Sequence, residues 1–140
     1  MAKSRYMSRF KWLIVIVLLT IITVGGIYMF TLNKKSEEER RNREYEVSLV
    51  KALKNSYTGI EEIKISHPNY TSPPGDWSCK VNIVFKDGEK ISYGISHYLD
   101  EEKNYNGRMT YGQRDFLNKR KGITISRVVI TYSNQEKGEQ

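Results

Sequence analysis

The chain of 140 residues is long enough for one small hydrophobic core beside a membrane segment, and for no second core. The net charge of +7 falls to +3 over residues 33–140, with 19 basic and 16 acidic side chains, because four cations precede the apolar stretch without any acid. Charge dispersed in this way argues against a nucleic-acid-binding domain, and a single cysteine excludes an internal disulfide.

A basic segment, residues 1–11, opens the chain and leads into a long apolar stretch, residues 12–32. The 21 residues from Trp12 to Leu32 include no charged side chain. As a helix they would be about 31 Å long, which matches a bilayer hydrocarbon core of about 30 Å. We therefore predict that residues 12–32 form a transmembrane helix that binds the lipid bilayer.

The end of this apolar stretch indicates a retained anchor. A cleavable signal peptide has an apolar region of about 7 to 15 residues and leaves it through small side chains. This stretch is longer and ends with the bulky residues Tyr28, Met29 and Phe30. The only cysteine, Cys79, lies too far downstream for lipid attachment beside the span. We predict that the helix stays in the membrane.

The cations on the two flanks of the span are nearly equal in number, so they do not decide its orientation. A short basic N-terminus normally stays in the cytoplasm, and a long C-terminal domain can be translocated whatever its charges. We therefore predict a single-pass protein of the cell membrane, with residues 1–11 in the cytoplasm and the C-terminal domain outside it.

A charged stalk, residues 33–44, is predicted to lead into the first helix of the domain. Ser36 and Glu39 match a capping box, in which both side chains satisfy free N–H groups at a helix start. Apolar residues at helical spacing begin only at Tyr45. The extracytoplasmic domain is therefore predicted to occupy residues 45–133.

After Gly59, a natural helix stop, apolar side chains recur at every second position. This pattern predicts three strands, the first separated from the second by a proline-rich loop at residues 67–76. Asp87 and Gly88, between the second and third strands, favour a two-residue type I′ hairpin. The inward-facing residues of these strands are predicted to be Ile63, Ile65, Trp77, Cys79, Val81, Ile83, Phe85, Ile91, Tyr93, Ile95, His97 and Leu99.

The remaining sequence predicts shorter elements. "RMTYG" is typical of a brief extended piece, "QRDFLNKR" of a short helical turn or a loop, and "GITISRVVITY" of a closing strand rich in β-branched residues. Residues 134–140 are predicted to be a polar tail. The predicted fold class is α+β: one N-terminal transmembrane helix, then a small domain with one helix packed on an antiparallel sheet of about four strands.

Few residues suggest catalysis or metal binding. His97 lies close to Asp100, Glu101 and Glu102, and His67 begins the proline-rich loop, but this spacing matches no metal-ligand motif. Cys79 could act as a nucleophile with a histidine as its base, although a cysteine on the inward side of a strand is more often a core residue. We predict no catalytic residue, no metal site and no cofactor.

Two groups of residues form a candidate interaction surface for an envelope protein or an anionic polymer. They are Tyr70, Asp76 and Trp77 around the proline-rich loop, and the consecutive cations Lys119, Arg120 and Lys121. Tyr105 and Tyr111 are further tyrosines in predicted loops. The simpler interpretation of the same residues is that Trp77 closes the sheet edge and that the cations form a solvated loop.

The order of these segments resembles a known kind of protein. A short basic start and one apolar span are followed by "EEERRNREYEVSLVKALKNSYTGIEEIKI", the turn "NYTSPPGDW" and the hairpin "VNIVFKDGEKISYGIS". Over Glu37 to Gly107 this is similar to small single-span Gram-positive bacterial membrane or lipoprotein-like proteins, whose shared extracytoplasmic domain has no assigned function. The resemblance implies an outward-facing domain and no catalytic residues. The lipid-attachment cysteine of some such proteins is absent, which favours a retained helix.

Three classes of function fit these expectations. The first is a non-enzymatic anchored domain that binds a protein or an envelope polymer, and it needs no catalytic set. The second is a scaffold subunit of an envelope secretion or conjugation assembly. The third is an envelope hydrolase or metalloenzyme, which would depend on His97, Cys79 or Asp76. We predict the first class, without nucleic acid as a partner.

Overall fold

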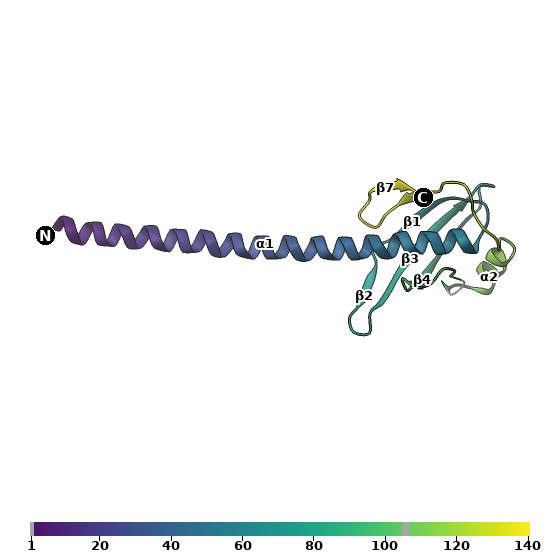
Figure 1. Cartoon of the computed structure of the whole chain (residues 1–140), viewed down its shortest axis with the longest axis horizontal. Helices are drawn as coiled ribbons and strands as arrows, with labels where there is room; N and C mark the ends of the chain where they lie inside the picture. The colour runs from purple at the N-terminus through teal and green to yellow at the C-terminus, as the bar shows by residue number, and fades with distance from the viewer. Residues whose placement is uncertain (1, 105–106) are drawn as a thin grey trace. The chain divides into compact units, whose positions relative to one another are not determined.

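The computed structural model describes residues 2–104 and 107–140, which form two compact units, Met1–Glu38 and Glu39–Gln140. The α+β class is confirmed, with one long N-terminal helix followed by a sheet. The elements in chain order are α1 (Ala2–Ser56), β1 (Ile60–Ile65), β2 (Asn69–Thr71), β3 (Asp76–Phe85), β4 (Lys90–His97), β5 (Gly107–Arg108), α2 (Tyr111–Asn118), β6 (Val129–Thr131) and β7 (Lys137–Glu139) (Figure 1).

The first unit consists of the N-terminal part of α1, and it contains the apolar stretch. Its large apolar side chains are exposed, from 45% at Ile14 to 69% at Ile22. Thr20 and Thr23 donate their hydroxyls to carbonyls one turn back, so these polar groups are satisfied within the helix itself. By length and composition this helix can cross a membrane.

The predicted helix start at Ser36 is wrong. α1 runs from Ala2 to Ser56, so Ser36 and Glu39 lie inside a helix, where no free N–H groups remain to be capped. The apolar stretch has already formed the helix, and propagation into the charged segment needs no new start. Packing also begins before the predicted boundary at residue 45, because Asn42 is only 6% exposed.

The second unit is a sheet with the last part of α1 packed on one face. The strand order is β5-β4-β3-β1-β6-β7, and β2 pairs with the first three residues of β3. The predicted sheet of about four antiparallel strands is wrong in two respects. Among the described residues the sheet has seven strands, and β1 and β6 are parallel, with Ile63 opposite Ile130. β2, β5 and β7 are two or three residues long, too short to produce an alternating pattern.

The core lies between this sheet and α1, which crosses the strands in Figure 1. The predicted inward residues of β1, β3 and β4 are confirmed, because alternation puts every second side chain on one face. Leu49, Val50 and Leu53 of α1 are fully buried against them. Leu99 is the exception: it is 43% exposed, because β4 ends at His97.

The hairpin between β3 and β4 is present, but its turn differs from the prediction. The Phe85 N–H bonds to the Glu89 carbonyl at 2.9 Å, which leaves three residues in the loop. The Gly88 N–H bonds to the Phe85 carbonyl at 2.9 Å, and only Gly88 in this loop has a positive φ, of 85°. A type I′ turn needs two such residues, so this loop is the three-residue type that ends in a left-handed glycine.

The C-terminal part of the domain is more regular than predicted. "QRDFLNKR" contributes to a second helix, α2, with Thr110 as its N-cap and a capping box to Gln113. The closing strand is shorter than predicted and only Val129–Thr131 pair, as β6. Residues 134–140, predicted to be a polar tail, instead include β7, which pairs with β6.

Candidate functional site

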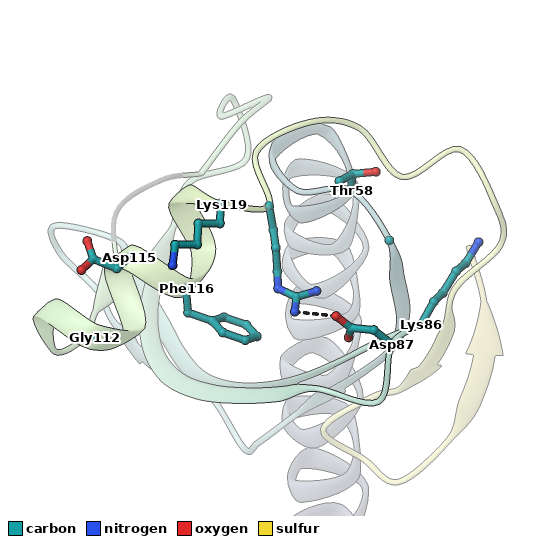
Figure 2. Close-up of a pocket in the computed structure, with 9 residues that line it drawn as sticks. Thr58, Lys86, Asp87, Gly112, Asp115, Phe116 and Lys119 are labelled. Carbon is teal, nitrogen blue, oxygen red and sulfur yellow. Dashed lines mark hydrogen bonds and ion pairs between the residues drawn. The ribbon is translucent and has the colours of Figure 1, made fainter.

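A pocket of about 800 Å³ opens near the C-terminal end of α1 (Figure 2). Four segments that are distant in the sequence line it: the residues before β1, the β3–β4 turn, α2, and the two residues after α2. The lining residues are Thr58, Gly59, Lys86, Asp87, Gly112, Asp115, Phe116, Lys119 and Arg120.

Backbone hydrogen bonds hold these segments together. The Thr58 N–H donates to the Arg120 carbonyl at 2.8 Å, and the Lys86 N–H donates to the Gly59 carbonyl at 2.9 Å. Gly59 has φ of 74°, a conformation that side chains disfavour, which explains the glycine at this turn. These main-chain contacts hold the residues before β1 against the β3–β4 turn and against the residues after α2.

Arg120 is held on the inner side of the pocket. Its guanidinium donates to the Asp87 carboxylate at 2.7 Å and lies 4.4 Å and 4.3 Å from the ring centroids of Phe85 and Phe116. Its side chain is only 20% exposed. The hydrogen bond from Arg120, joined by one from the Glu89 N–H, holds the pKa of the Asp87 carboxyl below its usual value.

The other cations of the pocket have no such partner. Within the described part of the chain, Lys86 and Lys119 form no ion pair. Figure 2 shows Lys119 on the α2 side and Lys86 on the opposite side, beside Asp87. Arg120 and Asp87 neutralise each other, which leaves two ammonium groups and the carboxylate of Asp115. The pocket is therefore mildly positive and carries an aromatic ring, a combination suited to an anionic group on a partly apolar ligand.

The structure separates the six predicted surface residues into three groups. Lys119 and Arg120 line the pocket, whereas Lys121 forms a β-bridge with Tyr57 and is not part of the lining. Tyr70, Asp76 and Trp77 belong to the β2–β3 hairpin. Lys86 and Phe116, which also line the pocket, were not predicted from the sequence. The capping pattern from Thr110 to Gln113 would have indicated the helix that presents Phe116.

The hairpin residues form structural contacts. Trp77 is fully buried, its indole N–H donates to the Asn42 side chain at 3.2 Å, and its ring stacks on Tyr45 at 5.3 Å. Trp77 therefore lies in the core, as its inward position in the strand pattern predicted, and its candidate place on an exposed interaction surface is wrong. Asp76 accepts the Tyr98 hydroxyl at 2.6 Å, which raises the pKa of Tyr98.

The remaining tyrosines differ in their surroundings. The guanidinium of Arg41 lies 4.0 Å from the ring centroid of Tyr70, which packs partly against the core. Tyr111 is 91% exposed at the start of α2. Tyr105 lies outside the described residues.

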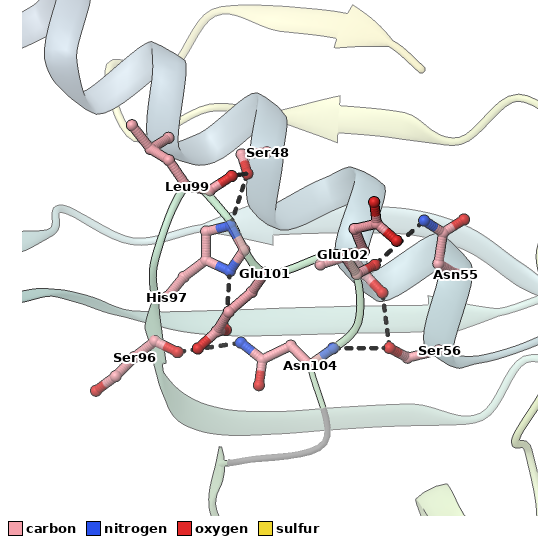
Figure 3. Close-up of polar contacts among 10 residues, drawn as sticks. Ser48, Asn55, Ser56, Ser96, His97, Leu99, Glu101, Glu102 and Asn104 are labelled. Carbon is pink, nitrogen blue, oxygen red and sulfur yellow. Dashed lines mark hydrogen bonds and ion pairs between the residues drawn. The ribbon is translucent and has the colours of Figure 1, made fainter.

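His97 is fully buried at the end of β4 (Figure 3). Its Nε2 lies 2.8 Å from the Ser48 hydroxyl, and its Nδ1 lies 3.5 Å from the Glu101 carboxylate, too far for a good hydrogen bond. Burial lowers the pKa of His97 to about 4, although Asp100 acts in the opposite direction. The imidazole is therefore neutral at neutral pH and packs as part of the core.

The Cys79 thiol is not activated as a nucleophile. Burial, and to a smaller degree the charge of Glu46, raises the pKa of the Cys79 thiol to about 12, so it is not a thiolate at neutral pH. His67 lies at the surface. Among the described residues, no three His, Cys, Asp or Glu side chains are grouped to hold a metal ion.

Comparison with protein-family models, curated proteins and solved structures finds no match to this chain. The resemblance to single-span Gram-positive membrane proteins therefore stays a prediction.

Proposed function

We propose that the chain is a single-pass membrane protein whose C-terminal domain binds an anionic group of an envelope protein or polymer in the pocket beside Arg120. The observation that carries this proposal is the pair of lysines, Lys86 and Lys119, that flank a fixed arginine and have no acidic partner in the described residues. A carboxylate or phosphate would pair with these ammonium groups while its carrier contacts Phe116.

The membrane part of the proposal rests on the apolar stretch. Residues 12–32 would cross the bilayer, and the basic residues 1–11 would stay in the cytoplasm, so the pocket would face the outside of the cell membrane. Exposure of this much apolar side-chain surface to water is unfavourable, and lipid would remove it.

The proposal includes no catalytic step. A nucleophile needs an activated side chain, and Cys79 is a buried thiol whose pKa is raised to about 12. A general base must reach a substrate, and His97 is fully buried under α1. Binding alone needs only the charge and shape that the pocket supplies.

Binding of a labelled polyglutamate and of labelled inorganic polyphosphate to the full chain in lipid nanodiscs tests this function. Lys86→Glu/Lys119→Glu reverses the two free charges of the pocket. The matched control is Lys64→Glu/Lys80→Glu, which makes the same charge change at exposed residues on the sheet face away from the core. We expect binding to at least one polymer to fall about tenfold or more in the pocket variant and much less in the control. Equal losses would refute a pocket-specific site.

A further inference from the structure

Residues 122–127 connect the pocket to β6 and run along the surface of the domain. Two large apolar side chains in this segment are exposed to solvent. Ile123 is 58% exposed and Ile125 is 92% exposed. Between them, the buried Thr124 accepts the Ile60 N–H at 3.2 Å and donates to the Tyr57 carbonyl at 2.7 Å. The alternation resembles that of a strand, with one side chain directed inward and its two neighbours outward.

The backbone of this segment alternates in the same way. The Gly122 and Thr124 N–H groups donate to the carbonyls of Ser56 and Lys54 at 3.1 Å and 2.7 Å, and so satisfy free carbonyls at the end of α1. Ile123 and Ile125 form no hydrogen bond to any described residue. Their N–H and C=O groups therefore remain free to pair with an added strand.

This edge, residues 123–125, is continuous with the pocket. A Cβ atom at Gly122 would lie 3.2 Å from the Cβ of Thr58, so the start of the segment packs against a residue that lines the pocket. Lys86 and Lys119 supply positive charge on the pocket side. At the other end, the Arg127 side chain is 83% exposed, with its guanidinium 3.7 Å from the carboxylate of Glu139.

We propose that the edge 123–125 and the pocket together bind an extended, acidic segment of a partner protein. The apolar side chains of that segment would cover Ile123 and Ile125, its backbone would pair with theirs, and its acids would meet the flanking cations. This inference rests on the proposed function, because the pocket lysines supply part of the charge.

The distribution of charge selects this partner over two others. A second copy of the chain, paired antiparallel, would bring Arg127 of one copy toward the pocket cations of its partner, and like charges across strands are unfavourable. A purely ionic polymer would neutralise the cations but would leave Ile125 exposed to water. An acidic peptide with alternating apolar residues satisfies both requirements.

Selection of phage-displayed random dodecapeptides on the full chain in nanodiscs tests the inference. We expect the selected peptides to alternate apolar and other residues and to carry acids. A synthetic copy should bind Ile125→Asp about 10- to 100-fold more weakly, since the variant removes an apolar contact and adds a repelling charge. Tyr111→Ser, an equally exposed aromatic site outside the edge, should bind as the wild type does.

Methylation of alternate backbone nitrogens of the peptide should also abolish binding, because strand pairing needs those N–H groups. The inference is overturned if no peptide is enriched, if the selected peptides lack acids, or if neither Ile125→Asp nor N-methylation weakens binding. Polyglutamate binding that depends on Lys86 and Lys119 would in that case leave the proposed function intact. Loss of that lysine dependence would instead refute the proposed function itself.

Discussion

Acidification from pH 7 to pH 4 is expected to destabilise the domain through His97. In the folded chain the pKa of His97 is lowered to about 4, from an ordinary value of 6.5, because the ring is buried. Between these values the unfolded chain binds one more proton than the folded chain, so each step toward acid favours unfolding. The stabilisation is complete above pH 6.5 and is lost as the pH falls to about 4.

The size of the effect follows from the two pKa values. A difference from 6.5 to about 4 corresponds to about 3 kcal/mol of unfolding free energy. For a domain of this size that amounts to a decrease in melting temperature of roughly 10 to 20 °C. Glu101 acts in the opposite direction, because burial and the charge of Asp100 raise its pKa and its protonation favours the folded state. Its side chain is 31% exposed, which makes it the weaker contributor.

Thermal unfolding of the full chain in detergent micelles, followed between pH 7.5 and pH 4, measures this effect. His97→Gln retains a group that can bond to Ser48 but takes up no proton, so its melting temperature should vary much less over this range. His67→Gln removes the exposed histidine and should keep the wild-type pH dependence. If His97→Gln and wild type lose stability in parallel, the buried imidazole is not the group responsible and the reasoning fails.

Three further substitutions test the packing and the turns. Leu53→Ala, at a fully buried position, should reduce the unfolding free energy in urea by about 3 kcal/mol, and a loss under about 1 kcal/mol would contradict the core assignment. Gly88→Ala should cost about 1 kcal/mol because of the positive φ, whereas Gly94→Ala, which meets only Arg108 atoms at 3.8 Å, should change stability less; the reverse order would refute the turn assignment. Thr110→Ala removes the N-cap of α2 and should cost about 1 kcal/mol by the same measurement, with an unchanged value excluding a stabilising cap.

Sequence reasoning succeeded where one pattern extends over many residues. The ten residues of β3 alternate strictly, so the inward side chains from Trp77 to Phe85 could be assigned without a structure. Short strands give no such pattern, and β5 has only two residues. The parallel pairing of β1 with β6 joins Ile63 to Ile130, and no local signal specifies a partner so far along the chain. Ser36 was misassigned because a capping pattern acts only where a helix actually begins.

Only part of the candidate site could be predicted, because its residues come from segments that are distant in the sequence. The three consecutive cations Lys119, Arg120 and Lys121 were predicted to form one charged surface. In the fold only Lys119 and Arg120 line the pocket, and Lys121 does not. Lys86 joins them because the β3–β4 turn ends near the same place. Nothing in the sequence around Lys86 indicates that it lies near Lys119 and Arg120, because the sheet register and α2 bring these residues together.

The pocket contains one cation whose side chain has structural contacts, Arg120, and two without them, Lys86 and Lys119. This difference determines which substitutions can test its function. Arg120 binds Asp87 and covers two core-facing rings, so its replacement would disturb packing as well as charge. The side chains of Lys86 and Lys119 form no hydrogen bond or ion pair with any described residue, so the fold loses little when they change. Loss of ligand binding in lysine variants can therefore be attributed to the site itself, whereas loss in an Arg120 variant cannot. For this reason the experiments on the proposed function rest on the two lysines.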